Sequence, residues 1–300
     1  MTDWRFWVDR GGTFTDVVAL PPDGRLQVRK VLSEQPGTPG DPAVNAMQGL
    51  LADAGFDATG VETGIAELRL GTTVATNALL EGAGEPVLLL TNAGLADLLW
   101  IGDQHRPDLF ALELKNTPFL AAAVEEVEGR LDAEGEEVTP LQLDQELEQR
   151  LREHHRRGLR SCAIVLLHAW RNPDHEQRLE ALARAVGFAT VICSHRVCPL
   201  PRMVPRGQTT LVEAAVAQPL FGYLDQVSRA LGQATRMRVM TSSGALQGRH
   251  QLLAKDTCPM AAAMVSTANA RAPSANASGV VPRASASNWK RSCTTARSGC

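Results

Sequence analysis

The sequence predicts an α/β layered fold, and three observations carry this prediction. Apolar segments of strand length alternate with amphipathic segments that begin at helix-capping residues. A meander of short apolar segments joined by turns rich in Gly and Pro precedes this alternation. The chain of 300 residues, 44% of them hydrophobic, is long enough for a substantial core and about two domains. Strands that alternate with helices bury their apolar faces when helix layers cover a sheet, which is the α/β arrangement.

The N-terminal part of the chain reads as a strand meander followed by a helix. Strands are expected over residues 6–8, 14–20 and 26–32, with tight turns between them. Asp41 followed by Pro42 predicts the start of a helix, because Asp is a preferred N-cap residue and Pro fits the first helical position. This helix is expected to run to Ala54 and to stop at Gly55.

The rest of the chain alternates between the two kinds of element. Further strands are expected at residues 67–70, 86–91, 162–167, 188–193 and 239–240, and further helices at 73–81, from 173, and at 209–231. A helix that begins at Thr139-Pro140 is expected to carry four leucines on one side and to end in a solvated turn, His154-His155-Arg156-Arg157. Residues 121–140 are acidic and are expected to form a loop-like connection on the surface.

Charge and hydropathy exclude several classes of partner. The net charge of −3 does not indicate a nucleic-acid partner. The sequence contains no apolar run of about 18 residues, the length of a membrane helix. The first residues lack the basic and apolar regions of a signal peptide, so we expect a cytoplasmic protein that does not contact a membrane. The six cysteines show no metal-ligand spacing and are expected to be reduced thiols.

The strongest candidate for a functional site is the turn Asp9-Arg10-Gly11-Gly12-Thr13-Phe14-Thr15-Asp16 between two expected strands. Phosphate binding needs backbone N–H groups that point into a concavity, and adjacent glycines let the backbone approach an anion closely. The hydroxyls of Thr13 and Thr15 can donate to phosphate oxygens, and a carboxylate at a strand end, such as Asp9, can hold Mg²⁺. The alternative is a plain β-hairpin, for which Gly-Gly is a common turn. The preceding Asp together with the Thr-x-Thr-Asp run favours phosphate binding.

Two other polar segments are weaker candidates. Thr72 and Thr73 open an expected helix after a strand, where free N–H groups favour an anion. Ordinary N-capping by Thr72 explains them without a ligand and is the simpler interpretation. Residues 101–108 offer an acid, a base and a guanidinium group in one turn-rich loop, which either contacts a substrate or forms a hydrated surface turn.

Taken together, these segments resemble the ATP-dependent 5-oxoprolinases and the related hydantoinase A subunits. Residues 6–16 look like the opening of this family, and later segments match it in the same order. Those segments are residues 32–34 (Leu-Ser-Glu), 71–81, 106–110 (Arg-Pro-Asp-Leu-Phe), 127–131 (Val-Glu-Gly-Arg-Leu) and 240–244 (Met-Thr-Ser-Ser-Gly). The similarity covers roughly residues 4 to 256, and several motifs in a fixed order make the resemblance specific.

The resemblance implies a fold similar to actin-like ATPases and sugar kinases. In that fold, two lobes each give a phosphate-binding hairpin to a nucleotide in the cleft. Gly11, Gly12 and Thr13 would then surround phosphates, Asp9 would approach Mg²⁺, and the cofactors would be ATP and Mg²⁺. The remaining residues of the implied cofactor site are Arg10, Thr15, Asp16, Thr72, Thr73 and Asn77.

The resemblance also implies a reaction, the opening of a cyclic amide coupled to ATP hydrolysis. For a 5-oxoprolinase the substrate is 5-oxo-L-proline and the product is L-glutamate, with phosphorylation of the amide oxygen making the carbonyl open to attack by water. Hydantoinase-type relatives act on other cyclic amides or on carboxylation substrates, which is the second interpretation. A third is a non-catalytic subunit that binds a hydantoinase B-like chain or a second copy of itself. An unrelated domain similar to sugar kinases is the last alternative.

Several segments depart from the family pattern. Gly82-Ala83-Gly84 stands where the family has a basic pair, Ala121-Ala122-Ala123 where it has an aromatic and acidic stretch, and Glu213 where it has Asn. From Thr257 onward the chain has no Asp or Glu, which indicates either a natural disordered tail or a shift of the reading frame.

The domain organisation expected from these observations has three parts. Residues 4–200 form the N-terminal domain of the family, residues 201–256 begin a second domain, and residues 257–300 form a low-complexity tail. The second Asp-x-Gly-Gly-Thr loop of the family is absent from these 300 residues, so the second lobe is incomplete. We therefore expect little or no 5-oxoproline-dependent ATPase activity from this chain alone.

Overall fold

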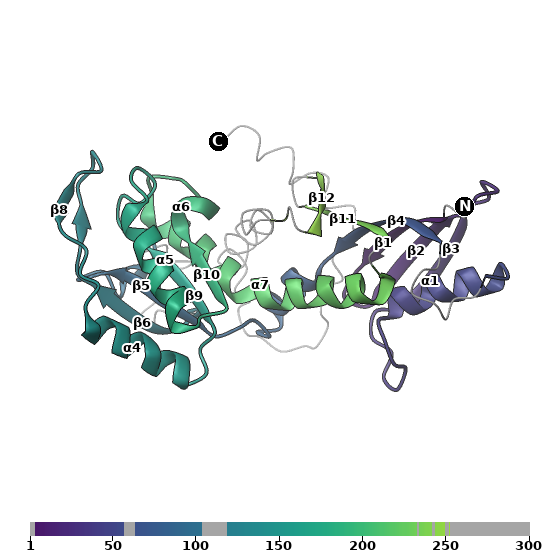
Figure 1. The fold of residues 1–300 in the computed structure, drawn as a ribbon, viewed down its shortest axis with the longest axis horizontal. Helices are drawn as coiled ribbons and strands as arrows, with labels where there is room; N and C mark the ends of the chain where they lie inside the picture. Colours follow the sequence, from purple (N-terminus) through teal and green to yellow (C-terminus); the bar gives the residue numbers. More distant parts are fainter. Residues whose placement is uncertain are drawn as a thin grey trace, which may run out of the picture.

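A computed structural model describes residues 4–56, 64–103, 119–232, 234–241, 244–249 and 252. They form two sheets, one of six strands and one of four, joined by a long helix, α7 (Met203–Leu231). Figure 1 shows the two sheets at opposite ends of the molecule, with α7 running from one to the other. The predicted α/β fold is confirmed. The expected tail at 257–300 lies outside the described residues.

The six-stranded sheet contains the predicted meander. Its strand order is β12-β11-β4-β1-β2-β3. The pairs β1/β2, β2/β3 and β11/β12 are antiparallel, and β1/β4 and β4/β11 are parallel. The strands span Trp4–Arg10 (β1), Phe14–Leu20 (β2), Gln27–Leu32 (β3), Ile65–Thr72 (β4), Arg236–Met240 (β11) and Leu246–Gly248 (β12). The sheet therefore joins the beginning of the chain to residues after α7, which sequence order did not predict.

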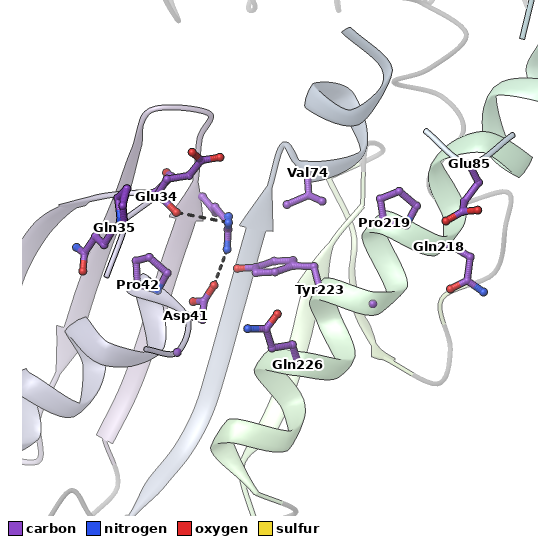
Figure 2. Close-up of a pocket in the computed structure, with 15 residues that line it drawn as sticks. Glu34, Gln35, Asp41, Pro42, Val74, Glu85, Gln218, Pro219, Tyr223 and Gln226 are labelled. Atoms are coloured by element: carbon purple, nitrogen blue, oxygen red, sulfur yellow. Dashed lines mark hydrogen bonds and ion pairs between the residues drawn. The ribbon is translucent and has the colours of Figure 1, made fainter. Parts of the chain in front are cut away.

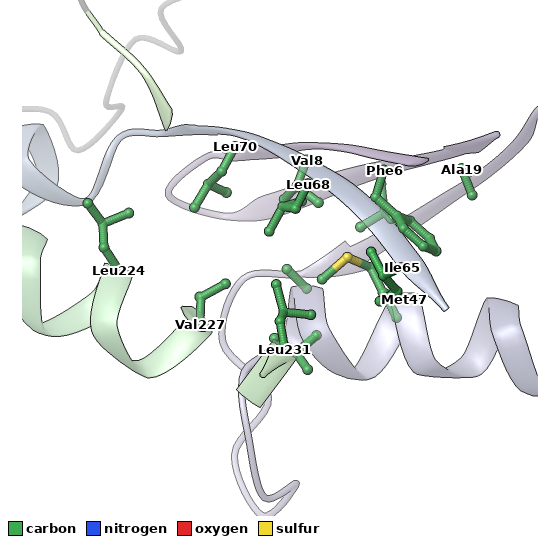
Figure 3. Packing of buried hydrophobic residues seen from close by; sticks show 14 of the residues in the cluster. Phe6, Val8, Ala19, Met47, Ile65, Leu68, Leu70, Leu224, Val227 and Leu231 are labelled. Atoms are coloured by element: carbon green, nitrogen blue, oxygen red, sulfur yellow. The ribbon is translucent and has the colours of Figure 1, made fainter. Parts of the chain in front are cut away.

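One face of this sheet is covered by helices α1 (Pro42–Asp53) and the C-terminal half of α7. The alternation of buried and exposed residues along β1 turns Phe6 and Val8 toward these helices. Figure 3 shows them packed with Leu68 of β4 against Met47 of α1 and Val227 of α7. The core of this half of the molecule is thus one layer of helices on one face of the sheet.

Helix α1 begins as predicted. The carboxylate of Asp41 accepts hydrogen bonds from the backbone N–H groups of Ala43 and Val44, at 2.9 and 3.2 Å. Two of the helix's unpaired N–H groups are satisfied in this way.

The four-stranded sheet is parallel throughout and has helices on both faces. Its order is β10-β9-β5-β6, with strands at Val87–Asn92 (β5), Ala121–Val127 (β6), Ser161–Val165 (β9) and Thr190–Cys193 (β10). Helices α4 (Gln145–Arg156) and α5 (Asp174–Val186) pack on one face. The short helices α3 (Leu98–Ile101) and α6 (Ser194–Val197) and the N-terminal half of α7 pack on the other. Because both faces are covered, β5 and β9 are buried at every position.

Two expectations about residues 121–157 are wrong. The segment 121–140 is not a loop: it contains β6 and a small antiparallel ribbon of β7 (Arg130–Leu131) and β8 (Glu137–Thr139). The helix predicted from Thr139-Pro140 begins instead at Gln145, with Asp144 as its N-cap. The sequence signal was weak because β6 is an edge strand and is half-exposed.

The histidines at the end of α4 are also not simply solvated. His154 lies 2.8 Å from Glu125 of β6, measured from Nε2 to Oε1, and its side chain is 13% exposed. The ring of His155 packs edge-on against Phe188. The two side chains therefore fix the last turn of α4 against β6 and Phe188.

Helix α7 is longer than predicted and contains Pro219 in its interior. Proline has no N–H, so the carbonyl of Ala215 loses its helical partner. The backbone N–H of Glu85, in the segment between α2 (Val74–Leu80) and β5, donates to that carbonyl at 2.8 Å. A Cβ added at Gly84 would lie 3.2 Å from the same carbonyl oxygen, which explains a glycine in this segment. The segment that connects the two sheets is thus hydrogen-bonded to α7 at the carbonyl that Pro219 leaves without a helical partner.

Candidate functional site

The Gly-Gly turn joins β1 to β2 at one end of the six-stranded sheet. The N–H of Gly11 donates to the carbonyl of Phe14 at 3.0 Å, and the N–H of Ser33 donates to the carbonyl of Thr13 at 2.9 Å. A Cβ added at Gly11 would lie 3.0 Å from the Phe14 carbonyl oxygen, and one at Gly12 would lie 3.1 Å from Nδ2 of Asn77. A side chain at Gly11 would therefore press on the backbone, and one at Gly12 would have to displace the Asn77 amide.

The two acids of the motif lie on the face of the sheet that α1 and α7 do not cover. Asp9 and Asp16 are cross-strand partners on β1 and β2. Asp16 forms an ion pair with Lys30 of β3, 2.8 Å from Nζ to Oδ1. Asp9 is exposed and makes no ion pair within the described residues. Its carboxylate is the free acid beside the turn.

Thr15 and Arg10 point the other way, toward the helices. Thr15 is 1% exposed, and its hydroxyl is 2.9 Å from that of Ser33. The hydroxyl of Ser33 in turn donates to the carbonyl of Gly11 at 2.8 Å. Thr15 therefore acts inside the fold, where it fixes the base of the turn.

The second predicted segment meets the first. Strands β1 and β4 are parallel neighbours, so their carboxyl ends place residues 71–77 beside the Gly-Gly turn. The N–H and the hydroxyl of Thr73 both donate to the carbonyl of Arg10, at 3.0 and 3.1 Å. Nδ2 of Asn77 lies next to Gly12 and donates to the Thr73 hydroxyl at 3.4 Å. The hydroxyl of Thr72 accepts from the N–H of Val74 at 3.2 Å, a local structural role.

A cleft of about 700 Å³ lies behind the turn, on the helical side of the sheet. Figure 2 shows its walls: the loop 33–42 on one side, and α7 with the segment before β5 on the other. Arg10 reaches into it and pairs with Asp41, 2.5 Å from Nη1 to Oδ2. The guanidinium lies 4.4 Å above the ring of Tyr223. Arg10 therefore belongs to the wall of this cleft, and its charge is already balanced.

Asp41 has two separable roles, because Oδ1 caps α1 and Oδ2 binds Arg10. We expect Asp41→Ala to lower the free energy of unfolding by about 2 to 3 kcal/mol, from a lost cap and a half-buried arginine without its partner. Asp41→Asn keeps the capping oxygen and is expected to cost about 1 kcal/mol. Urea unfolding followed by circular dichroism distinguishes the two. Asp41→Asn removes only the ion pair, whereas Asp41→Ala removes the ion pair and the cap. Equal costs for the two variants would therefore show that the cap does not contribute to stability.

No sequence pattern predicted the buried polar network that lies beside the four-stranded sheet. Glu176 of α5 is fully buried and accepts four hydrogen bonds, from the N–H groups of Leu166 and His195, the Ser194 hydroxyl and Nδ1 of His195. Arg206 of α7, also fully buried, donates to the Ser194 hydroxyl and to two backbone carbonyls. No spacing in the sequence relates these residues, since they meet only when α5, α6 and α7 pack on β9 and β10.

This network is not a good metal site, although Glu176, Cys193 and His195 bring possible ligand atoms within 4.8 Å of one another. The Glu176 carboxylate is saturated with hydrogen-bond donors, and burial raises the pKa of the Cys193 thiol, which disfavours a metal-binding thiolate. Burial also raises the pKa of Cys162. No disulfide joins Cys162, Cys193 and Cys198, the cysteines in the described part of the chain.

The third candidate segment is only partly described. Residues 104–108 lie outside the described residues, as do 106–110 of the family resemblance. Asp103, at its start, lies 3.9 Å from Arg202. No described helix is long and apolar enough to cross a membrane.

Comparison with known proteins gives the family. The model of the hydantoinase/oxoprolinase N-terminal region matches residues 5–187, so the chain belongs to this family. It is 34% identical over 272 residues to 5-oxoprolinase 1 of Arabidopsis thaliana, covering 80% of this chain and 21% of that protein. It is 32% identical to the caprolactamase subunit alpha of Pseudomonas jessenii, covering 81% of this chain and 36% of the relative.

Solved structures agree in fold. A chain of ATP-dependent caprolactamase from Pseudomonas jessenii superposes with a TM-score of 0.67 at 28% identity, over 85% of this chain and 38% of that one. A nucleotide-free acetone carboxylase chain superposes with a TM-score of 0.69 at 21% identity, over 86% of this chain and 39% of that one. The chain thus spans about a fifth of the length of the 5-oxoprolinase and less than two fifths of these structures.

Proposed function

We propose that this chain is the N-terminal part of an ATP-dependent cyclic amide hydrolase, and that its β1–β2 turn binds phosphates of ATP. The observation that carries the proposal is the close approach of Gly12 to Asn77, with 3.1 Å between a Cβ at Gly12 and Nδ2 of Asn77. Gly12 and Thr13 are exposed, their backbone N–H groups make no hydrogen bond to any described residue, and the Asn77 side-chain amide lies beside them. Such groups bind anions without the cost of desolvating a charge.

The geometry divides the predicted site residues by role. Gly12, Thr13 and Asn77 are the proposed phosphate contacts, because Gly12 and Thr13 are exposed and the Asn77 amide lies beside Gly12. Gly11 is proposed to shape the turn, because its N–H already donates to the Phe14 carbonyl. The other polar residues of the motif position the turn from behind or beside it, through the hydrogen bonds and ion pairs described above. These positioning residues are Arg10, Thr15, Asp16, Thr72 and Thr73.

Asp9 is the proposed Mg²⁺ ligand. Its carboxylate is exposed and free of ion pairs within the described residues, in contrast to that of Asp16. Mg²⁺ in nucleotide sites is bound by one or two carboxylates together with phosphate oxygens and water, so a single free carboxylate beside a phosphate turn fits it. When bound, the ion would neutralise negative charge on the phosphates.

The proposed reaction is transfer of the terminal phosphoryl group of ATP to the oxygen of a cyclic amide, followed by attack of water on the amide carbon. The ring C–N bond then breaks as its nitrogen takes a proton, and a second water hydrolyses the resulting acyl phosphate to the carboxylate and phosphate. Positioning and charge neutralisation are what such a transfer requires. The substrate we propose first is 5-oxo-L-proline, because of the identity to 5-oxoprolinases; another cyclic amide is the second candidate, supported by the caprolactamase. The word "subunit" in the latter's name supports a second chain of the hydantoinase B kind as partner. A reaction that consumes ATP fits the cytoplasmic location expected from the sequence.

Binding of a fluorescent ATP analogue to the full chain, with and without Mg²⁺, tests the phosphate site. We expect Gly12→Val to weaken binding at least about tenfold, because its side chain meets Asn77 and closes the turn. Asp9→Asn is expected to remove most of the enhancement by Mg²⁺ and to leave binding without the metal unchanged. Asp23→Asn, in the exposed turn between β2 and β3, is the control and should bind as the wild type does. If Gly12→Val binds as tightly as the control, the turn is not the phosphate site.

A further inference from the structure

The cleft behind the turn has the features of a second ligand site. Its volume of about 700 Å³ lies in the range of small-molecule pockets. It opens between the end of β1, the start of α1 and the middle of α7, on the opposite side of β1 from Asp9. A molecule bound there would contact neither Asp9 nor the exposed side of the Gly-Gly turn.

The charge of this cleft is unbalanced. Arg10 is the single cation among its lining residues, and it is already paired with Asp41. Glu34 and Glu85 line opposite walls, and neither makes an ion pair in the part of the chain that the structure describes. An anion that enters the cleft therefore meets two carboxylates with no free cation to offset them.

The cleft also contains a polar group that lacks a partner. Tyr223 is 8% exposed, and its hydroxyl donates to no acceptor among the described residues, while the Arg10 guanidinium lies near its oxygen and lowers its pKa in smaller part. Burial, and next the negative charge of Asp41, raise the pKa of this hydroxyl to about 12, so it remains a donor. Figure 2 shows the side chain extending from α7 into the cleft, toward Asp41. A buried hydroxyl without a partner is costly, and an acceptor on a bound molecule would remove that cost.

We propose that this cleft binds a small molecule that carries a carbonyl or amide group and no negative charge. The carbonyl oxygen accepts from Tyr223, and the exposed amide of Gln226 offers a further donor and acceptor along α7, whereas Nε2 of Gln218 already donates to the Thr190 hydroxyl at 3.2 Å. Glu34 and Glu85 determine the specificity, because they disfavour an anionic ligand. The inference concerns a different cavity from the phosphate turn, and only the choice of cyclic amides as probes rests on the proposed function.

Gly222 allows the cleft to be closed without damage to the fold. It lines the cleft, and a Cβ added there meets no atom within 4 Å. In a helix interior, Leu and Ala are both favoured over Gly, so Gly222→Leu fills the cleft while α7 is retained. Gly222→Ala leaves the space open and is the matched control.

The test compares 5-oxoproline with its neutral amide, which has the same ring and nearly the same size, by ligand-observed NMR titration of the full chain at pH 7. We expect the amide to bind at least about tenfold more tightly than the acid. Gly222→Leu should abolish binding of the amide, and Gly222→Ala should retain it. Tyr223→Phe should weaken binding of the amide about fivefold or more. The double variant Glu34→Gln, Glu85→Gln should bring the two affinities within about threefold of each other.

Three outcomes would overturn the inference: the acid binds the wild type as tightly as the amide, Gly222→Leu binds the amide as Gly222→Ala does, or neither ligand binds the wild type. The ATP analogue is measured separately on the same variants. Binding of the ATP analogue is expected to depend on the turn and not on Gly222. A failure of the phosphate proposal would therefore not affect the interpretation of amide binding in the cleft.

Discussion

Replacement of Arg206 by methionine is expected to lower the free energy of unfolding by about 3 to 5 kcal/mol, the typical cost of removing one partner from a buried charged network. Arg206 is fully buried, burial lowers the pKa of its guanidinium, and the guanidinium donates to three groups. Nη1 donates to the carbonyl of Leu200 at 2.7 Å, Nη2 to that of Leu166 at 2.5 Å, and Nε to the Ser194 hydroxyl at 3.0 Å. Methionine leaves the Leu200 carbonyl without a donor and removes the shorter of the two hydrogen bonds to the Leu166 carbonyl, the other coming from the Ala169 N–H at 3.3 Å. It also leaves the nearby Glu176 carboxylate without a compensating charge.

Arg152→Met is the matched control, because Arg152 is 53% exposed and pairs with Glu148 one turn earlier on α4. An exposed pair of this kind contributes about 0.5 kcal/mol or less. Urea denaturation of the wild type and both variants, followed by circular dichroism, gives the comparison. A cost for Arg206→Met no larger than that for Arg152→Met would mean that the network is not needed for stability. Arg206→Lys keeps the positive charge but cannot make all three hydrogen bonds in the same geometry. Its cost in unfolding free energy should therefore lie between those of Arg206→Met and Arg152→Met.

Gly129→Ala is expected to cost about 2 to 4 kcal/mol, the sum of backbone strain and overpacking. The φ angle of Gly129 is +143°, a conformation that residues with a Cβ rarely adopt. A Cβ there would also lie 2.9 Å from the backbone Cα of Leu141, which cannot rotate away. The carbonyl of Gly129 accepts from Nδ2 of Asn92 at 2.7 Å, so a shift of this backbone also disturbs the end of β5.

Gly158→Ala separates the two causes. Its φ angle is +100°, but a Cβ added there meets nothing within 4 Å. The expected cost is therefore about 1 kcal/mol, from strain alone. In thermal unfolding, the melting temperature of Gly129→Ala should lie well below that of Gly158→Ala. Equal melting temperatures would contradict the packing argument.

The elements that sequence reasoning placed correctly carry their signals within a few residues. Asp41 caps α1 through hydrogen bonds to the N–H groups of Ala43 and Val44, and these residues follow it closely in the sequence. The strands on either side of the Gly-Gly turn pair as expected, since alternation of apolar and polar residues fixes which side faces the core. The α/β class followed from the same local patterns.

The elements that were misplaced depend on distant neighbours. Strand β6 has a sequence of alanine and glutamate that carries little strand propensity, and it forms because β5 provides a fully buried neighbour on one side. Glu125 of β6 pairs with Arg150 and His154 of α4, which fixes this strand against the helix. The segment expected to be a surface loop is therefore part of the sheet. Likewise, α4 starts only at Gln145, because Thr139, the expected start of the helix, is the last residue of β8.

The candidate site shows the same division. The sequence alone identified the turn and the residue types that suit a phosphate, because glycine, hydroxyl and carboxylate groups act through properties they carry anywhere. Which of them are available was decided by tertiary structure: Thr15 is buried against Ser33, Asp16 is paired with Lys30, and Asp9 is left free.

The sequence by itself determined the α/β class, the hairpin, the cap of α1 and membership of the hydantoinase/oxoprolinase family, since each is encoded by short segments in a fixed order. Only the tertiary structure joined β4 and β11 in one sheet, brought Arg10 over Tyr223 and closed the network of Glu176 and Arg206. The physical reason is that these contacts unite residues far apart along the chain. Their energies come from burial and mutual hydrogen bonding, and they exist only once both lobes have packed on α7.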